Sequence, residues 1–336
     1  MREAKLDHTD RSLLNLLQAH FPISRQPFAE LGVSLGLDEK EVIERIGRLK
    51  QAQIIRCIGP IFDSRSLGYR STLVAMRIPK ERLERAVRIV NEHPGVSHNY
   101  ARSSTLNLWF TLAVPPGDDL KNELQALVNR IGPEEVLDLP AVRLFKIGVF
   151  FDVAGDGRVG GSLPAKPKRA LQPAPTLSSS EEATVRELQQ DIPLTSRPFD
   201  AIAERVGVGV DELLRCCRAL LERGVMRRFG ASIRHQSVGF AANAMVCWRV
   251  PPAMVEEVGK TMSAFKEVSH CYEREASEGW PYNVFAMIHG KTREDCQHTI
   301  RRIVDQTGIG KYKALFTIKE FKKERVRLAA TKERQT

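Results

Sequence analysis

The stretch Val96-Ser-His-Asn-Tyr-Ala-Arg102 recurs as Val268-Ser-His-Cys-Tyr-Glu-Arg274, at an offset of 172 residues in a chain of 336 residues. Five further pairs of similar segments keep this offset to within one residue. They are Arg25-Gln-Pro-Phe28 with Ser196-Arg-Pro-Phe199, Ile54-Ile-Arg-Cys-Ile-Gly59 with Val225-Met-Arg-Arg-Phe-Gly230, Ser66-Leu-Gly-Tyr69 with Ser237-Val-Gly-Phe240, Met76-Arg-Ile-Pro79 with Trp248-Arg-Val-Pro251, and Leu144-Phe-Lys-Ile147 with Leu315-Phe-Thr-Ile318. The repeat is longer than the roughly 20–50 residues of a solenoid unit. The sequence therefore predicts one module used twice.

The first part of each module has the apolar spacing of helices. In the first copy it comprises Leu13, Leu14, Leu16 and Leu17, followed by Val42, Ile43, Ile46 and Leu49. Asp38 and Asp211 stand where an N-cap would begin the last helix of each set. Three short helices followed by a hairpin-like segment predict a winged helix-turn-helix, which we place at 1–60 and again at 180–231.

The second part of each module alternates between strand-like and helix-like segments. In the first copy, strands are predicted at 72–78, 97–102, 106–114 and 142–150, and helices at 81–92 and 120–131. This β-α-β-β-α-β order is the ferredoxin-like split motif. We place ferredoxin-like domains at 61–153 and 232–325, so the fold class is α+β in tandem.

Residues 154–179 join the two copies and are rich in Gly, Pro and Ser, which predicts a flexible linker. This segment includes Gly155-Asp-Gly-Arg-Val-Gly160, which matches a dinucleotide-binding fingerprint. Such a fingerprint must open a helix, whereas two prolines follow within seven residues at Pro164 and Pro167. We therefore interpret it as part of the linker.

The net charge of +10 comes from 51 Lys and Arg against 41 Asp and Glu. Segments 154–180 and 319–336 carry seven of these ten charges, so the folded modules are nearly neutral. A basic tail is predicted at 326–336. The predicted recognition helices begin with carboxylates, Asp38-Glu-Lys-Glu41 and Val210-Asp-Glu-Leu213, which repel phosphate. DNA is therefore an unfavoured partner.

Apolar residues make up 42% of the chain, which excludes disorder throughout. No apolar run is long enough for a transmembrane helix, and we expect no membrane association and no secretory signal. The six cysteines include no Cys-x-x-Cys pair. They predict free thiols in a reducing cytoplasm, and neither they nor the histidines are spaced to bind a metal.

The repeated strand carries the sharpest functional signal. Side chains two positions apart share one face of a strand, so His98, Tyr100 and Arg102 align. The second copy has the equivalent set His270, Tyr272 and Arg274. A polar edge strand would explain one such set, but its repetition favours function. Arginine binds carboxylates in a bidentate manner and histidine exchanges protons near neutral pH, so the pattern predicts an acidic substrate.

Further polar and aromatic residues gather in the second copy. Arg234 and His235 precede one strand, and Trp280, Tyr282 and Asn283 precede another. Together with Trp248, these aromatic side chains would either form the wall of a site for a flat ligand or pack in the core. The sequence leaves both interpretations open.

Several motifs resemble those of a known family. The tandem of winged helix and ferredoxin-like domain is similar to the Lrp/AsnC regulators, and more specifically to the siroheme decarboxylases. The first copy resembles one subunit of that family through Ile58-Gly-Pro-Ile-Phe-Asp-Ser-Arg65, His93-Pro-Gly-Val-Ser-His-Asn-Tyr100 and Asn107-Leu-Trp-Phe-Thr-Leu112. The second copy resembles the other subunit through Phe229-Gly-Ala-Ser-Ile-Arg-His235, Gly239-Phe-Ala-Ala-Asn-Ala-Met245, Val268-Ser-His-Cys-Tyr-Glu-Arg274 and Trp280-Pro-Tyr-Asn-Val-Phe-Ala-Met-Ile-His-Gly290. Two departures are Leu106, in place of the family's Tyr, and the loop 275–279.

This resemblance implies a carboxy-lyase that removes two acetate carboxyl groups of siroheme as CO2. The product, didecarboxysiroheme, leads to haem d1 or to haem. Its partners would be siroheme, its product and neighbouring tetrapyrrole enzymes, with no cofactor beyond the iron tetrapyrrole itself. The two copies would pair as an intramolecular pseudo-dimer, with further dimerisation left open.

The resemblance also assigns roles to residues. Arg102 and Arg274 would orient carboxylates, and His98, His235 and His270 would supply a proton. Tyr100 and Tyr272 would position the acetate or relay the proton. The helpers in binding would be Arg65, Arg77, Arg234, Arg249, Trp248, Trp280, Tyr282 and Asn283. The alternatives are an Lrp/AsnC-type regulator that senses a tetrapyrrole or amino acid, and a tetrapyrrole carrier without activity.

Overall fold

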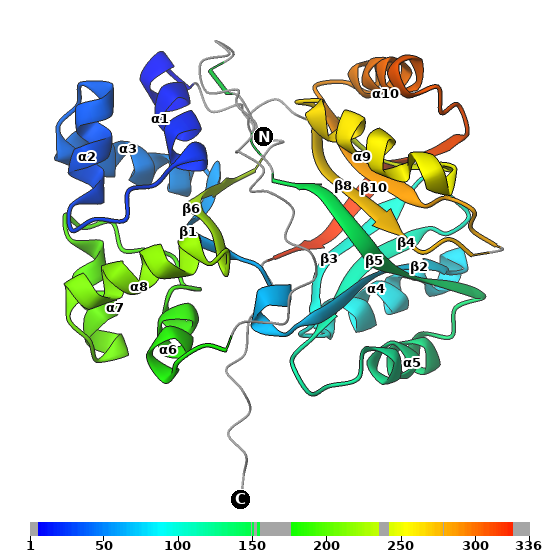
Figure 1. Cartoon of the computed structure of the whole chain (residues 1–336), viewed down its shortest axis with the longest axis horizontal. Coiled ribbons are helices and arrows are strands. Elements are labelled where there is room, and N and C mark those ends of the chain that lie inside the picture. The colour runs from blue at the N-terminus through cyan, green and yellow to red at the C-terminus, as the bar shows by residue number, and fades with distance from the viewer. Residues whose placement is uncertain are drawn as a thin grey trace, which may run out of the picture.

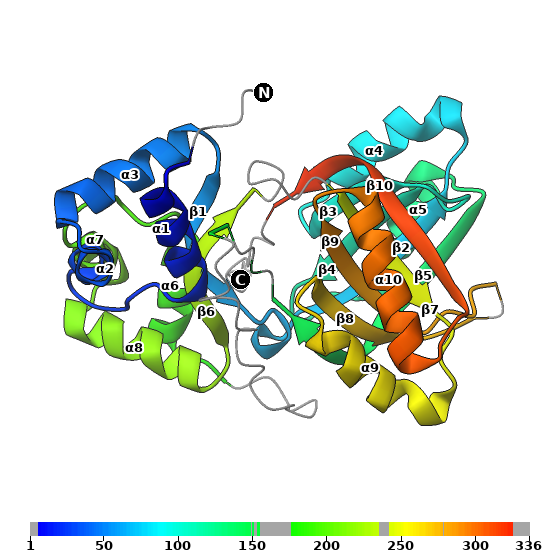
Figure 2. The same ribbon diagram turned by 90° about the horizontal axis from the view of Figure 1, so that it is seen from above.

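A computed structural model describes residues 6–148, 150, 153–154, 176–234, 242–277 and 279–324. Figures 1 and 2 show two units side by side, one mostly helical and one built around strands. Most of the predicted linker, the Gly155–Gly160 motif, His235 and the basic tail lie outside the described residues.

The helical unit contains both winged helix-turn-helix copies, as predicted. The first copy comprises α1 (His8–Ala19), α2 (Pro27–Leu35), α3 (Glu39–Gln51) and β1 (Ile55–Phe62), and the second comprises α6 (Ser179–Glu187), α7 (Pro198–Val206), α8 (Val210–Glu222) and β6 (Met226–Ile233). Asp38 caps α3 by accepting a hydrogen bond from the backbone of Glu41. The predicted cap at Asp211 is wrong. Gly209 is the N-cap of α8, and Asp211 lies in the first turn, where its carboxylate binds Arg25 with a shortest N–O distance of 2.6 Å.

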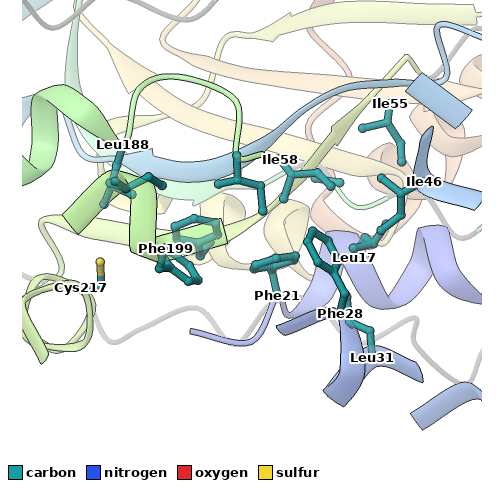
Figure 3. Close-up of a cluster of buried hydrophobic side chains, with 14 of the residues drawn as sticks. Leu17, Phe21, Phe28, Leu31, Ile46, Ile55, Ile58, Leu188, Phe199 and Cys217 are labelled. Atoms are coloured by element: carbon teal, nitrogen blue, oxygen red, sulfur yellow. The ribbon is translucent and has the colours of Figure 1, made fainter. Parts of the chain in front are cut away.

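The two copies share one hydrophobic core. Strands β1 and β6 pair antiparallel, with Gly59 opposite Gly230. Phe229 of the second copy stacks on Phe21 of the first at 5.4 Å and contacts Phe199 edge-on at 5.8 Å. Figure 3 shows side chains of both copies converging in this core. The predicted intramolecular pairing is confirmed for this unit.

The second unit contains both ferredoxin-like domains, each with the predicted β-α-β-β-α-β order. The first comprises η1 (Arg65–Leu67), β2 (Arg70–Arg77), η2 (Lys80–Arg82), α4 (Leu83–Glu92), β3 (Val96–Arg102), β4 (Leu108–Val114), α5 (Leu120–Ile131) and β5 (Glu135–Ile147). The second comprises β7 (Ala242–Trp248), η4 (Pro252–Met254), α9 (Val255–Ala264), β8 (Val268–Arg274), β9 (Val284–Gly290), α10 (Arg293–Thr307) and β10 (Tyr312–Lys323).

The two sheets close into one barrel in the order β10-β3-β4-β2-β5-β8-β9-β7. Strands β5 and β10 close it because each pairs with its own copy at one end and with the other copy at the other end. Strand β5 begins at Glu135, seven residues before the predicted start at 142. Pro140, which cannot donate a ladder hydrogen bond, lies where β5 changes its partner from β2 to β8.

Each sheet has a helix-covered face and a face toward the barrel interior. Helices α4 and α5 cover an apolar core on the first sheet, and α9 and α10 cover one on the second (Figure 1). A separate cluster of buried residues from both copies, including Trp109, Leu139, Met245 and Leu315, fills part of the interior. Within the described residues, no helix is both long and apolar enough to span a membrane.

Candidate active site

The two repeated strands β3 and β8 present their His-Tyr-Arg sets to the barrel interior. Val96 and Val268 lie in the helix-covered cores, and a register shift between each valine and the histidine two positions on turns the following His-Tyr-Arg set to the other face of the sheet. The side chain of Arg102, on the opposite face, reaches the carbonyl oxygen of Leu315 at 3.2 Å and the hydroxyl of Thr317 at 3.1 Å, both on β10. The six repeated side chains predicted from the sequence therefore lie on the interior face of the barrel.

The two arginines are buried cations. Arg102 is 4% exposed, and Arg274 is partly buried and donates to the carbonyl oxygen of Leu139 at 2.5 Å. Burial lowers the pKa of each guanidinium to about 10. Within the described part of the chain, neither forms an ion pair with a carboxylate, and the buried Nε of each has no hydrogen-bond partner. Two buried cations with unused donors suit an anionic ligand.

A tyrosine lies between the histidine and the arginine on each strand. The Arg102 guanidinium lies 5.1 Å from the centre of the Tyr100 ring, and Arg274 lies 4.9 Å from that of Tyr272. Burial raises the pKa of both phenols, so they stay neutral and can donate hydrogen bonds. The rings of His98 and His270 lie 6.3 Å and 6.4 Å from their tyrosines.

Each histidine is held by the serine that precedes it. Ser97 Oγ lies 2.8 Å from Nδ1 of His98, and Ser269 Oγ lies 2.8 Å from Nδ1 of His270. Burial, assisted by nearby cations, lowers the pKa of His98 to about 3 and that of His270 to about 4. Both imidazoles are therefore neutral at pH 7, and Nε2 is the nitrogen left to act on a ligand.

Cations from the helical unit and from β10 extend the site. Arg56 of β1 forms an ion pair with Glu320 at 3.3 Å, and Arg227 of β6 forms one with Asp63 at 2.9 Å. Arg56 helps to lower the pKa of His98, and Arg227 helps to lower that of His270. Lys323 lies opposite His98 in the β10–β3 register, and burial lowers the pKa of its ammonium to about 8.

Sequence reasoning missed these three cations, although the signal was present for two of them. Arg56 and Arg227 occupy the same place in the repeated segments Ile54–Gly59 and Val225–Gly230. Arg65, which was predicted, is placed near the second set, because its charge acts on Tyr272 and Arg274.

The predicted aromatic wall divides between two places. Trp280 is buried in the barrel interior, 5.6 Å from Trp109 and 5.1 Å from Tyr282. The placement of Trp248 contradicts its predicted role. It is fully buried in the helix-covered core of the second sheet, because it lies one position out of step with the interior-facing Cys247.

Asn283 is also a correction. Its side-chain amide accepts from the backbone N–H of Val250 and donates to the Val250 carbonyl oxygen, each at 2.9 Å. Asn107 makes the same pair of bonds with Ile78 at 3.0 Å and 2.8 Å. Both amides clamp a strand end, and their hydrogen-bonding groups are used in the framework.

Three predicted binding arginines lie away from the interior. Arg77 is half exposed and pairs with Glu134 at 3.2 Å and with Glu135 at 3.8 Å, so carboxylates of the protein already bind it. Arg249 is exposed at the end of β7. Arg234 is exposed and donates to Gln53 at 2.9 Å. We therefore withdraw Arg77 and Arg249 from the site, while Arg234 borders the undescribed segment that holds His235.

Among the described residues, no cluster of three or more His, Cys, Asp or Glu side chains is placed to hold a metal ion. What the arrangement can do follows from its charges. It can bind a molecule with several carboxylates through arginines and hold neutral imidazoles against it.

Two family models match this chain, each of them twice. An AsnC-like ligand binding domain matches residues 66–146 and 237–322. A siroheme decarboxylase NirDL-like HTH domain matches residues 10–56 and 181–227.

Similar proteins include one that matches nearly the whole chain and one that matches about half of it. The siroheme decarboxylase of Hydrogenobacter thermophilus is 40% identical over 319 residues, which cover 94% of this chain and 93% of the relative. The siroheme decarboxylase alpha subunit of Desulfovibrio desulfuricans is 44% identical over 153 residues, 46% of this chain and 88% of that subunit. A crystal structure of the siroheme decarboxylase NirDL in co-complex with an iron-uroporphyrin III analogue superposes with a TM-score of 0.71 at 37% identity, covering 96% of this chain and 94% of that one.

Proposed function

This chain belongs to the siroheme decarboxylase family, in the form that carries both halves on one polypeptide, and we propose that it acts on siroheme as a carboxy-lyase. It removes two acetate carboxyl groups as CO2 and leaves methyl groups, which gives didecarboxysiroheme. The product then serves the formation of haem d1 or of haem.

The observation that carries this proposal is the pair of buried arginines. Siroheme has eight carboxylates around a planar ring, so its site must compensate many negative charges at once. Arg102 and Arg274 offer buried donors without carboxylate partners in the described chain, and Arg65 adds charge near the second set. Arg56 and Arg227 also lie close to the histidines, but each is already paired with a carboxylate. A guanidinium that lacks a counter-ion in a dry site gains most from an incoming carboxylate.

The chemistry needs a proton for each carboxyl group that leaves. As CO2 departs, the electron pair of the broken C–C bond remains on the methylene carbon and is delocalised into the ring, and that carbon then takes up a proton. His98 and His270 are placed to give this proton from Nε2, since Nδ1 of each is engaged by serine. We propose that no cofactor other than the iron tetrapyrrole takes part.

The test is anaerobic incubation of the purified protein with siroheme, followed by mass spectrometry of the tetrapyrrole and measurement of CO2. We expect loss of two carboxyl groups per ring. Tight binding of siroheme without CO2 release would identify a carrier instead and would overturn the proposal.

The regulator alternative is disfavoured by the helix-turn-helix pair. The first turn of α3 carries Glu39 and Glu41, and that of α8 carries Asp211 and Glu212. Glu39 accepts a hydrogen bond from Ser196 of the other copy at 3.0 Å, and Asp211 binds Arg25. Both helix N-termini are thus acidic and tied to the partner copy. Salt-dependent binding to one operator in preference to random DNA would contradict this interpretation.

The six cysteines are free thiols in this fold, four of them buried. We therefore place the enzyme in a reducing cytoplasm. Two halves that share one core and one barrel have no need of a second chain to complete the site, although a further dimer of the whole protein is compatible with it.

A further inference from the structure

The second copy contains a histidine that the first copy lacks, directly behind its site histidine. Ser269 Oγ lies 2.8 Å from Nδ1 of His270 and 2.7 Å from Nε2 of His289. The carbonyl oxygen of Met287 is a longer contact of the same hydroxyl, at 3.5 Å. The two rings are the nearer partners, and a serine hydroxyl has one proton, so with both rings bound it donates to one and accepts from the other. The three side chains therefore form a chain in which the protonation of one ring fixes that of the next.

The equivalent position in the first copy is Ala113. Strand register establishes the match, because Leu112 pairs with Val96 as Ile288 pairs with Val268. The backbone N–H groups of Ala113 and His289 also donate to equivalent carbonyl oxygens, those of Gly95 and Glu267. Ser97 holds His98 just as Ser269 holds His270, but among the described residues no imidazole makes a hydrogen bond with Ser97 besides His98.

We propose that His289, acting through Ser269, is a positioning residue that makes His270 the proton donor of the second copy. When His289 carries a proton on Nε2, it donates to Ser269 Oγ, and Ser269 then donates to Nδ1 of His270. That leaves the proton of His270 on Nε2, the nitrogen not used by the serine. This inference rests on the proposed decarboxylation.

The hydrogen-bonded series His289–Ser269–His270 also explains how a neutral imidazole could give up a proton. Burial lowers the pKa of His270 to about 4, so its imidazolium is scarce at neutral pH. A neutral imidazole that gives up its Nε2 proton becomes an anion unless Nδ1 gains a proton at the same time. Here the methylene carbon takes the Nε2 proton, Ser269 passes its hydroxyl proton to Nδ1, and His289 passes its Nε2 proton to Ser269. The relay balances when His289 takes up one proton for each CO2 that leaves and returns to a neutral ring at the end of the step.

The same hydrogen-bonded series predicts that His98 and His270 differ as proton donors. Ser97 can either donate to His98 or accept from it, so both neutral tautomers of His98 are open. Ala113 stands behind Ser97 in place of a ring, so the serine does not fix the tautomer of His98, although Lys323 lies opposite His98 on β10. The second copy is the one that protonates carbon efficiently.

The experiment compares matched variants of the whole protein. Ser269→Ala and His289→Ala are expected to lower kcat at least tenfold with KM nearly unchanged, whereas Ser97→Ala lowers kcat less than about threefold. His289→Ala recreates the alanine that the first copy has at this place. His289→Gln, which keeps a donor but carries no transferable charge, is expected to retain the tautomer and still to lose turnover.

A second measurement needs no turnover. Histidine labelled with 15N reports which ring nitrogen is protonated, and His270→Gln assigns the signal. We expect the Nε2–H tautomer for His270 in the wild type and a mixture in Ser269→Ala. Equal kinetic effects of Ser269→Ala and Ser97→Ala, or an unchanged His270 signal in Ser269→Ala, would overturn the inference. A wild-type protein that releases no CO2 from siroheme would instead refute the proposed function.

Discussion

Strands β3 and β8 carry the same three side chains in the same order, yet they lie among different neighbours. Both place a serine-held histidine, a tyrosine and a buried arginine on the barrel face. Around β3 stand Arg56, Glu320 and Lys323, whereas β8 has Arg227 and a second histidine behind its serine. The two copies therefore share the side chains on the barrel face of the strand. They differ in the charged and titratable groups that surround each histidine.

Replacing the site histidines is the largest expected effect and separates the two strands directly. His270→Ala is expected to lower kcat by about a hundredfold, within the range of general acid catalysis, and His98→Ala by less than tenfold. His235→Ala, in the undescribed segment before β7, is expected to lower turnover more than tenfold. The measurement is CO2 release at saturating siroheme. Near-normal turnover of both His270→Ala and His235→Ala would refute this assignment of the second copy.

The buried arginines give the next effect. Arg102→Met and Arg274→Met remove a charge-assisted bond to a substrate carboxylate, so each is expected to raise KM about tenfold or more. Arg102→Met is also expected to raise the free energy of unfolding by about 1 kcal/mol, because it removes a buried cation without a carboxylate partner. For Arg274→Met we expect a smaller rise in the free energy of unfolding, because Arg274 is less buried. Urea unfolding beside steady-state kinetics measures both, and a large loss of stability in Arg102→Met would contradict the substrate-binding role.

Acid should destabilise both copies alike. The pKa of His270 is about 4 in the fold and that of His98 about 3, against 6.5 for an unperturbed histidine. Between these values the unfolded chain binds more protons, so the free energy of unfolding rises with pH from about 4 to 6.5. Each histidine contributes a slope of up to about 1.4 kcal/mol per pH unit. Urea unfolding of His98→Gln and His270→Gln at pH 4.5, 5.5 and 7 should show equal flattening. A slope unchanged by either substitution would mean that neither ring is held neutral.

Much of the fold follows from local pattern, and the closure of the barrel does not. Alternation and helical spacing predict the elements between 72 and 131, because each side chain's face depends on its near neighbours. The change of partner in β5 at Pro140 depends on a strand more than 100 residues away, so a local pattern cannot reveal it. The proline in fact argues for a break there.

The site shows a similar limit. The six repeated side chains were found because both copies share them. His289 was missed because the first copy has Ala113 in its place, and a search for what two copies have in common passes over what one has gained. Trp248 was misassigned because residue type was weighed without its position in the strand. Its neighbour Cys247 faces the interior, so Trp248 must face the helices.

The smallest expected effect concerns two arginines that share a position in the repeat but not a role in the site. Arg77 already binds Glu134 and Glu135, and Arg249 is exposed at the matching strand end. Exposed ion pairs contribute about 0–1 kcal/mol, and solvated guanidinium groups gain little from one more carboxylate. Arg77→Ala and Arg249→Ala should therefore each change KM for siroheme by less than about twofold, measured beside Arg102→Met as the buried counterpart. A KM raised as far as in Arg102→Met would mean that siroheme reaches the open strand ends, and the division between buried and exposed cations would fail as a guide to the site.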